Sequence, residues 1–251
     1  MKILNVFDCA GMGAIFSHEL DNGSKVIQLR QLDPFGFGDF YKNTDYYNTI
    51  GDVLTNAYEV CQDYDRVVIW DMPDDIPAFN DHPDVTIFYC GSRLRNSPQT
   101  CNDHQAKRAF LTSEDLIQYK PKGIFIPIGV DRNHFKPMPS DIYDEVPFKI
   151  TKTYFLSRLN EMRSGIKMHD RDKDPINYRD MPKILNQHRF YDDLKIDTAK
   201  PPKPLPFLSG TALQALACGK TVIDWKRDII TEFPEQHDSE TAAKNFMDNL
   251  K

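Results

Sequence analysis

The sequence predicts an α/β protein made of two Rossmann-like domains, each with a largely parallel sheet. Residues 2–7 form a short apolar strand that is followed by a glycine loop and a helical segment, which is how such a domain opens. Residues 66–71 and 85–90 are near-continuous apolar runs, typical of parallel strands that are covered on both faces. Residues 206–224 predict a loop, a short helix and a buried strand, and therefore a second unit of the same kind.

Length, charge and cysteine content limit the possible functions. With 251 residues the chain has room for one large domain or two small ones, and its net charge of −6 gives no electrostatic reason to expect a nucleic acid as partner. No apolar run approaches the ~20 residues of a membrane span, and Asp8 follows the first strand too soon for a signal peptide. The five cysteines are scattered and lack a C-x-x-C pair, which indicates a reducing cytoplasm and predicts neither a disulfide framework nor a zinc site.

The loop after the first strand contains Gly11 and Gly13. It lacks a third glycine, and no acidic residue stands where a dinucleotide site would place its ribose partner, so the loop does not predict NAD binding. We expect instead that the backbone at Gly11 and Gly13 approaches a substrate, which makes both glycines candidate binding residues.

The other elements follow from the same patterns. Asp71 ends the strand 66–71 and lies at the carboxyl end, where open α/β sheets bind their ligands. The remaining predictions are a strand over 25–30, a glycine and aromatic loop over 33–39, a helix over 49–64, strands over 107–113, 122–127 and 148–156, a charged surface excursion over 167–182, a helix over 181–191, a proline-rich loop over 197–206 and a closing helix over 239–250.

Residues 127–137 resemble the P-N-G-V-D-x-x-x-F-x-P stretch of GT-B glycosyltransferases of the retaining family 4 (group 1) type. The matching positions are Gly129, Val130, Asp131, Phe135 and Pro137, while Ile128 replaces the asparagine. In that family the stretch crosses from the first domain to the second. The resemblance therefore implies an N-terminal acceptor-side domain over 1–137 and a reduced donor domain over 138–251. It also implies that the two domains face each other across a cleft, with the last helix packing back on the first domain.

Residues 213–223 resemble the E-A-L-A-C-G-x-P-V-I signature of the same family, where a loop and helix bind the donor nucleotide-sugar. Just before it, Ser209, Gly210 and Thr211 predict a helix N-terminus, whose free backbone N–H groups suit a phosphate or a sugar hydroxyl. The resemblance implies that these three residues bind the donor. It implies the same for Gln214, which stands where the family has a glutamate that holds the ribose.

Residues 157–164 resemble G-R-L-x-x-x-K-G, in which an arginine and a lysine grip the donor diphosphate. Arg158 and Arg163 keep both positive charges. A leaving nucleoside diphosphate gains negative charge, and fixed guanidinium groups stabilise that charge without a metal. The resemblance therefore implies a catalytic role for Arg158 and Arg163.

Residues 91–95 resemble the H-G-S-x-L-R turn that several family members carry. The resemblance implies that Gly91 and Ser92 contact the donor. Cys90 stands where the family has a histidine beside the reacting sugar, and it is the candidate catalytic residue at that position.

Three family positions are changed in this chain. Cys90 replaces the histidine, and Pro206 and Gln214 replace two acidic residues that stand eight apart. Losing one positioned catalytic group typically costs ~10²–10⁴ in rate. Three interpretations therefore stay open: an active glycosyltransferase, a glycosyltransferase-like binding protein or subunit without turnover, and a sugar-nucleotide epimerase of similar architecture.

The resemblance also sets the expected partners. The donor is a nucleotide-sugar such as a UDP- or GDP-sugar, and the acceptor is an undetermined glycan, lipid or protein. Neither a cofactor nor a metal is expected. We expect a cytoplasmic protein without a transmembrane segment, for which peripheral membrane contact stays open.

Overall fold

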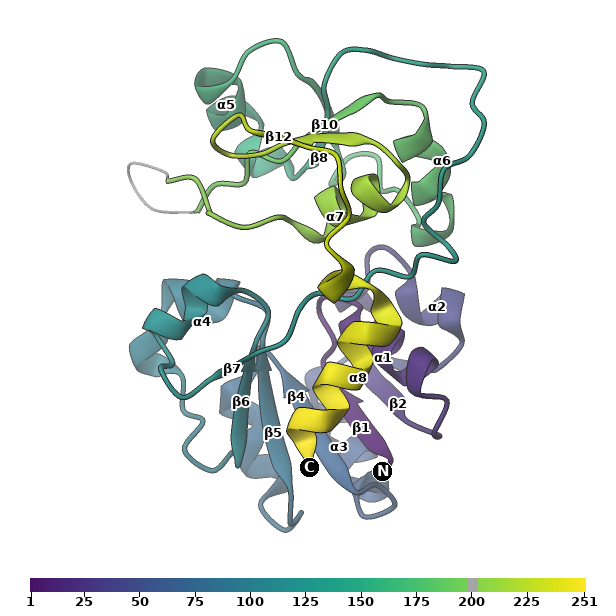
Figure 1. The fold of residues 1–251 in the computed structure, drawn as a ribbon. Helices are drawn as coiled ribbons and strands as arrows, with labels where there is room; N and C mark the ends of the chain where they lie inside the picture. The colour runs from purple at the N-terminus through teal and green to yellow at the C-terminus, as the bar shows by residue number, and fades with distance from the viewer. Residues whose placement is uncertain (198–202) are drawn as a thin grey trace. The chain divides into compact units, whose positions relative to one another are not determined.

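The chain divides into two compact units (Figure 1), and the computed structural model describes residues 1–197 and 203–251 of it. The first unit consists of Met1–Gly129 and Ser239–Lys251, and the second unit consists of Val130–Asp238. The sequence predicts the boundary after residue 137, whereas the structure places it after Gly129. The last helix belongs to the first unit. The proline-rich loop expected over 197–206 includes residues 198–202, which lie outside the described residues.

Among the described residues, the first unit contains a sheet of seven parallel strands in the order β3-β2-β1-β4-β5-β6-β7. The strands are β1 (Ile3–Val6), β2 (Lys25–Leu29), β3 (Thr44–Tyr47), β4 (Arg66–Trp70), β5 (Val85–Tyr89), β6 (Arg108–Leu111) and β7 (Ile124–Phe125). The chain builds outward from β1 to β3 on one side and from β4 to β7 on the other. The order therefore reverses between β1 and β4, and ligands of open α/β sheets bind outside the carboxyl ends of the strands at such a point.

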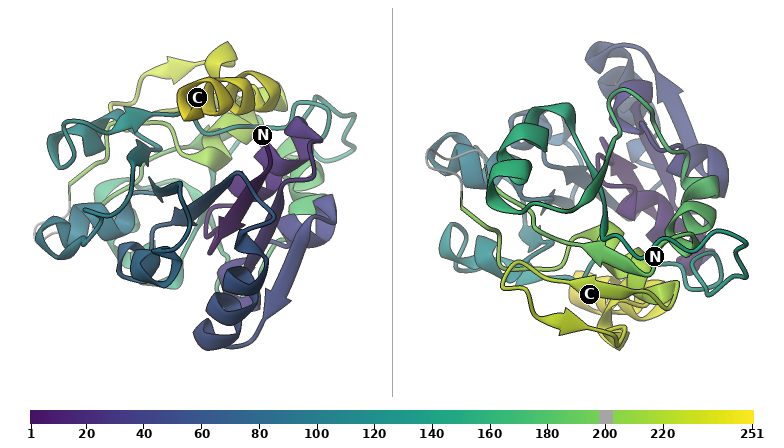
Figure 2. Two further views of the ribbon diagram at one scale, coloured as in Figure 1. Left: turned by 90° about the horizontal axis from the view of Figure 1, so that it is seen from below. Right: turned by 90° about the horizontal axis from the view of Figure 1, so that it is seen from above.

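The two faces of this sheet carry separate apolar cores. On one face, Val67 and Ile69 of β4 pack with α3 (Ile50–Cys61). On the other face, Val68 and Trp70 pack with α1 (Met12–Leu20) and α8 (Ser239–Leu250). Figure 2 shows α3 and α8 on opposite sides of the strands. Successive strand residues point to opposite faces, so a sheet covered on both faces buries a continuous apolar run, as the sequence predicts.

Phe246 holds α8 on the first sheet. Its ring centroid lies 5.1 Å from that of Phe16 in α1, and 5.7 Å and 5.3 Å from those of Phe88 and Phe110. Burying one such side chain contributes roughly 1.5–3 kcal/mol. The end of the chain is thereby tied to its beginning, and α1 and α8 run side by side (Figure 1).

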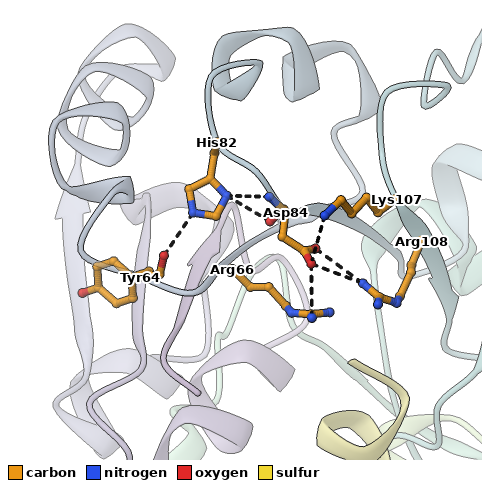
Figure 3. A network of polar contacts seen from close by, with 6 residues as sticks. All are labelled: Tyr64, Arg66, His82, Asp84, Lys107 and Arg108. Atoms are coloured by element: carbon orange, nitrogen blue, oxygen red, sulfur yellow. Dashed lines mark hydrogen bonds and ion pairs between the residues drawn. The ribbon is translucent and has the colours of Figure 1, made fainter. Parts of the chain in front are cut away.

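A charged network ties together the amino ends of β4, β5 and β6 (Figure 3). The carboxylate of Asp84 lies 3.1 Å from Arg66 Nη2. It also lies 3.6 Å from Lys107 Nζ and 3.5 Å from Arg108 Nη1. His82 adds hydrogen bonds to the main chain of the same region. The amino edge of the sheet is thus fixed by ion pairs, whereas the carboxyl edge carries the candidate site described below.

The second unit contains, among its described residues, a sheet in the order β12-β11-β10-β8-β9. Its strands are β8 (Phe148–Thr151), β9 (Lys167–Asp170), β10 (Phe190–Asp192), β11 (Thr221–Ile223) and β12 (Ile229–Ile230). All pairs are parallel except β11 with β12. Helix α7 (Gly210–Ala217) packs against β10 and β11. The predicted α/β class with two Rossmann-like sheets is confirmed.

The first strand of the second unit is shorter than predicted. The strand expected over 148–156 ends at Thr151, and helix α5 (Thr153–Met162) follows. The hydroxyl of Thr153 donates to Asp170 at 2.8 Å, and these polar side chains end the buried strand and begin the helix.

Two further predictions in this unit are confirmed only in part. The stretch 167–182, expected as a surface excursion, begins with the edge strand β9, where charged residues are tolerated because one side faces no partner strand. The helix expected over 181–191 stops at Asn186, and β10 begins at Phe190. The side-chain amide of Asn186 donates to two main-chain carbonyls and fixes this helix end.

The remaining short elements connect these parts. They are the helices α2 (Phe37–Tyr41), α4 (Ser92–Asn96) and α6 (Met181–Asn186), and the 3₁₀ turns Arg30–Leu32, Pro73–Phe79, Pro98–Thr100, Glu114–Gln118, Tyr178–Asp180 and Glu235–His237. Helix α2 begins inside the loop expected over 33–39.

Candidate functional site

The carboxyl edge of the first sheet gathers four polar side chains from three strands. Asp8 and Cys9 follow β1, Asp71 follows β4, and Cys90 follows β5. Cys9 shares a side-chain hydrogen bond with Cys90, and the charges of Asp8 and Asp71 act on the Cys90 thiol. We refer to these four residues as the carboxyl-edge cluster.

Asp8 is the fully buried member of the cluster, with 1% of its surface exposed. Its Oδ2 accepts a hydrogen bond from the main-chain N–H of Ala14 at 2.8 Å, in the first turn of α1. Its Oδ1 is buried and accepts no hydrogen bond of ordinary geometry from the described residues. Burial outweighs the neighbouring backbone amides and raises the pKa of Asp8 to about 6. A group with that pKa can exchange its proton near neutral pH, as a general base or acid must.

The local sequence explains why this carboxylate is buried. Phe7 is buried and has a φ of 64°, in the left-handed region, so the chain turns sharply where β1 ends. Gly13 leaves room for the side chain, because a Cβ at that position would lie 3.0 Å from the Asp8 Cγ. The apolar strand, the left-handed turn and the glycine together seat Asp8 against the start of α1.

Asp71 occupies the corresponding place after β4. Its φ is 56°, and its Oδ1 is also buried without a hydrogen bond from the described residues. Burial raises the pKa of Asp71 above its ordinary value, although the backbone amides of Arg93, Cys90 and Gly91 lie near enough to oppose this shift. The sheet thus places the buried Asp8 and the partly buried Asp71 on either side of the point where its strand order reverses.

The Cys90 side chain is a protonated thiol. Its hydrogen bond with Cys9, its burial and the charges of Asp71 and Asp8 raise the pKa of Cys90 well above its ordinary value. A thiol that keeps its proton at neutral pH does not supply the base that a histidine at this position would supply. Among the members of the cluster, Asp8 is the better proton acceptor.

The two glycines of the first loop contact the protein's own side chains. Gly11 has a φ of 72° and precedes α1, and a Cβ there would lie 2.4 Å from the Phe37 Cγ. The ring of Phe37 therefore covers Gly11, just as the carboxylate of Asp8 covers Gly13. Their packing explains both glycines, and the substrate contact that we expect of them stays a prediction.

In the turn after β5, a side chain of the protein likewise packs against the glycine. A Cβ on Gly91, whose φ is 116°, would lie 2.2 Å from Arg95 Nη1. Arg95 forms a bidentate ion pair with Asp115, with its Nε 2.7 Å from Oδ2 and its Nη2 2.9 Å from Oδ1. The two predicted binding residues of this turn differ in exposure. Gly91 is buried, whereas Ser92, the first residue of α4, is exposed to solvent.

In the second unit, the N-terminus of α7 lies beside a buried carboxylate. Ser209 is the N-cap of α7, and its Oγ accepts a hydrogen bond from the Ala212 N–H at 3.2 Å. The same hydroxyl donates to Asp193 Oδ1 at 2.5 Å, and the Ser209 N–H donates to Asp193 Oδ2 at 2.9 Å. A negative charge near a helix N-terminus is stabilised by the helix dipole. Both donors of Ser209, its N–H and its hydroxyl, are therefore bonded to Asp193 of the protein itself.

The other predicted donor-binding residues share the first turns of the same helix. Gly210, Thr211 and Gln214 are each partly exposed on α7. Thr211 also makes a side-chain hydrogen bond with Tyr191 of β10. The structure thus brings together all four donor-binding residues predicted from residues 206–224, on one short helix.

Arg163 lies inside the second unit. Its Nη1 is 2.5 Å from Asp192 Oδ2, and only 9% and 1% of the two side chains are exposed. Its Nη2 donates to the carbonyls of Asp224 and Trp225 at 3.1 Å and 3.3 Å. A substrate diphosphate would have to displace this buried ion pair, so the geometry favours a structural role for Arg163 over the predicted catalytic one.

Arg158 has a different environment from Arg163. It lies on α5 and is partly exposed, with its guanidinium carbon 5.0 Å from the ring centroid of Tyr154. Its Nη1 is buried and has no hydrogen-bond partner within the described residues. Of the two predicted diphosphate-binding arginines, Arg158 is therefore the one that keeps an uncommitted N–H group.

Residues 1–197 and 203–251 contain neither a metal-binding cluster nor a helix suited to cross a membrane. In these ranges, no three His, Cys, Asp or Glu side chains are placed to hold a metal ion. In the same ranges, no helix combines the length and the apolar character that crossing a membrane requires.

Two acids of the structure were not among the residues predicted from the sequence. Asp8 could have been predicted from the sequence, because it directly follows an apolar strand and precedes a glycine loop. That position lies at the edge of the sheet where such folds bind ligands. Asp193 could not have been predicted, because it follows β10, a strand that begins inside a stretch whose pattern predicts a helix.

Comparison with known proteins identifies the fold. No protein-family model matches the chain, and no curated protein matches its sequence. Among solved structures, the chain is similar to the UDP-GlcNAc 2-epimerase from Methanocaldococcus jannaschii, with a TM-score of 0.51 and 12% identity over 100% of this chain and 99% of that one. Similarity extends to a second UDP-N-acetylglucosamine 2-epimerase (TM-score 0.46, 13% identity, 100% and 87% covered) and to the glycotransferase of kitacinnamycin (TM-score 0.44, 8% identity, 98% and 84% covered).

These likenesses concern the fold. The chain has the GT-B type of α/β fold that the sequence predicts, with two Rossmann-like sheets in one chain. Membership of glycosyltransferase family 4 is not established by them and stays a prediction.

Proposed function

We propose that the protein is a glycosyltransferase that moves a sugar from a nucleotide-sugar to an acceptor hydroxyl, with Asp8 as the proton acceptor. The observation that carries this proposal is the buried Asp8 carboxyl, whose pKa is raised to about 6 at the carboxyl end of β1. Perturbed acids at the ligand edge of an α/β sheet are candidates for acid–base chemistry. The GT-B type of fold and the family-like stretch over 127–137 support the substrate class.

The proposed reaction uses Asp8 in one step. The acceptor oxygen forms a bond to the anomeric carbon of the sugar, and the bond from that carbon to the diphosphate breaks. The hydroxyl proton passes to Asp8, whose Oδ1 accepts no hydrogen bond from the described residues, and the nucleoside diphosphate leaves with the bonding electrons. A carboxylate with a pKa of about 6 is still ionised at pH 7 and is a stronger base than an ordinary aspartate. Such proton transfer typically contributes ~10²–10⁴ in rate.

On the donor side, we propose that the first turn of α7 and Arg158 bind the nucleotide-sugar. The backbone N–H groups of Gly210 and Thr211 begin the helix, where anions are favoured. Gln214 lies one turn further and can hydrogen-bond a ribose hydroxyl. Arg158 supplies a guanidinium with an uncommitted N–H, which can stabilise the leaving diphosphate without a metal or cofactor.

A sugar-nucleotide epimerase is the second candidate. One observation favours it: burial of their carboxyl groups raises the pKa of both Asp8 and Asp71, at the same edge of the sheet. Inversion of a carbon by removal and return of a proton needs two acid–base groups, whereas glycosyl transfer needs one proton acceptor.

Nucleotide binding followed by turnover assays tests the proposal. Titration calorimetry with UDP, GDP and ADP should show binding of at least one nucleoside diphosphate. With the matching sugar donor, release of the diphosphate should rise when an acceptor is added. A 2-epimerised sugar formed without acceptor would identify the epimerase instead, and binding without turnover would indicate a binding protein. Failure of all three nucleotides to bind would contradict the whole substrate class.

A further inference from the structure

Cys9 and Cys90 stand level with each other at the carboxyl edge of the first sheet. Cys9 comes three residues after Val6, and Cys90 comes three residues after Ile87. Val6 and Ile87 both pair with Ile69, since β4 lies between β1 and β5. At the level of the two cysteines β4 has already ended, so the segments that follow β1 and β5 can approach each other.

The two thiols are in contact with each other. A side-chain hydrogen bond joins them, and both cysteines are free and partly exposed. Cys61 and Cys218 are buried instead. Cys101 is also partly exposed, but its thiol donates to the main-chain carbonyl of Ser97 at 3.4 Å. Among the five cysteines, Cys9 and Cys90 are the two that the structure pairs with each other.

A disulfide between the two cysteines requires the sulfurs to move closer together. To form a disulfide, the sulfurs have to close from a hydrogen-bond contact to about 2.05 Å. Both residues lie outside the regular strands, and Gly91 directly follows Cys90. The approach of the two sulfurs therefore involves residues outside the paired strands.

We propose that Cys9 and Cys90 form a dithiol site that oxidants of the peroxide or disulfide class convert reversibly to a disulfide. With a peroxide, the two thiols lose two electrons and two protons, the S–S bond forms, the O–O bond breaks, and the peroxide is reduced to water or alcohol. A dithiol reductant restores both thiols by exchange through a mixed disulfide. The disulfide would cross the edge that holds Asp8 and Asp71, and oxidation would thereby block the acid–base site; this last consequence rests on the proposed function.

Thiol mapping of the native protein tests the site directly. The folded chain is treated with a small excess of hydrogen peroxide or of oxidised glutathione, its remaining thiols are capped with a maleimide, and the digest is examined by mass spectrometry. We expect the number of free thiols to fall by two from five. We also expect one linked peptide pair that contains Cys9 and Cys90, and full recovery with dithiothreitol.

Matched variants distinguish this pair from general oxidation. Cys9→Ser and Cys90→Ser should each abolish the linked pair, and Cys101→Ser, at another partly exposed cysteine, should leave it unchanged. Five thiols after treatment, a link to a different cysteine, or sulfinic acid on single cysteines would overturn the proposal. Because the wild-type digest alone decides the matter, a variant that fails to fold does not affect the result.

A second readout separates the site from its consequence. If the disulfide forms and the diphosphate release of the oxidised protein falls at least ten-fold and recovers with dithiothreitol, both parts of the proposal hold. If the disulfide forms and an active protein keeps its rate, the blocking of the acid–base site is wrong. If the protein shows no glycosyltransferase or epimerase activity, the linked peptide pair in the mass spectrum still decides whether the disulfide forms.

Discussion

The acids at the carboxyl ends of the strands have different partners in the two units. In the first unit, Asp8 and Asp71 each keep one buried oxygen without a hydrogen bond from the described residues. In the second unit, Asp192 is held by Arg163 at 2.5 Å, and both oxygens of Asp193 accept hydrogen bonds. Burial raises the pKa of Asp193 as it does in the first unit. These acids of the two units therefore differ in the partners of their oxygens.

This difference separates acids that can do chemistry from acids that hold the fold. A carboxylate whose oxygens are all engaged is fixed, and removing its partner leaves a buried charge that costs about 3–5 kcal/mol of stability. A carboxylate with an unengaged oxygen can accept a proton or a hydrogen bond from a substrate. Without a substrate, its buried oxygen has no hydrogen bond, which lowers the stability of the fold. We therefore expect substitution of Asp8 or Asp71 to change activity, and loss of the partners of Asp192 or Asp193 to change stability.

The largest effect is expected from Asp8→Asn. The amide keeps the shape and an acceptor for the Ala14 N–H but cannot take up a proton, so turnover should fall ~10²–10⁴-fold. Diphosphate release in the presence of acceptor measures this, with circular dichroism to show that the fold is kept. A variant that retains activity within a few-fold would remove Asp8 from the mechanism.

The next effect is on the second unit, through Arg163→Met. Asp192 would then be buried without its cation, and the free energy of unfolding should fall by about 3–5 kcal/mol, as measured by urea denaturation. Arg158→Met, at the half-buried arginine of the same helix segment, is the matched control and should cost much less. If Arg163→Met is as stable as the wild type and loses only nucleotide affinity, the structural role assigned to Arg163 is wrong.

The stability of the first unit should also depend on pH through Asp8. Burial raises the pKa of Asp8 from 3.8 to about 6, so the folded state holds its proton more tightly than the unfolded state. The contribution of Asp8 is therefore most favourable below pH 4 and is lost as pH rises to 6, by about 3 kcal/mol in all. Urea denaturation at pH 4, 5, 6 and 7 measures it. Asp8→Asn should remove this part of the slope, and identical slopes for the two proteins would contradict the raised pKa.

The smallest effect is expected at the donor side. Arg158→Ala removes one charged hydrogen bond, worth about 1.5–3 kcal/mol, and should weaken binding of the nucleoside diphosphate by roughly ten-fold or more. Arg158→Lys keeps the charge and should lose less. Calorimetric titration compares the three proteins, and equal affinity for all of them would show that the diphosphate binds elsewhere.

The fold of the first unit could be predicted from the sequence because its strands are apolar and its helices periodic. The strand over 66–71 and the helix over 239–250 appear as β4 and α8 within a residue or two. In the second unit, β9 and β10 are short and partly polar, so their patterns resemble a surface segment and a helix. Their positions are fixed by pairing with β8, which local sequence does not encode.

The candidate site could be predicted only where its residues are neighbours in the chain. Ser209, Gly210 and Thr211 share one helix end, and the sequence places them correctly at the start of α7. The burial of Arg163 depends on Asp192, 29 residues away on the strand β10, which begins inside the stretch predicted as a helix. The carboxyl-edge cluster likewise depends on the strand order, which brings the ends of β1, β4 and β5 together.

The pH dependence of kcat/KM for acceptor-dependent diphosphate release tests the central claim most directly. If Asp8 accepts the proton, the wild-type rate should rise with pH through an apparent pKa near 6 and level off above it, and Asp8→Asn should show a low rate without that rise. A wild-type profile that is flat between pH 5 and 7, or an unchanged rise in Asp8→Asn, would contradict the account.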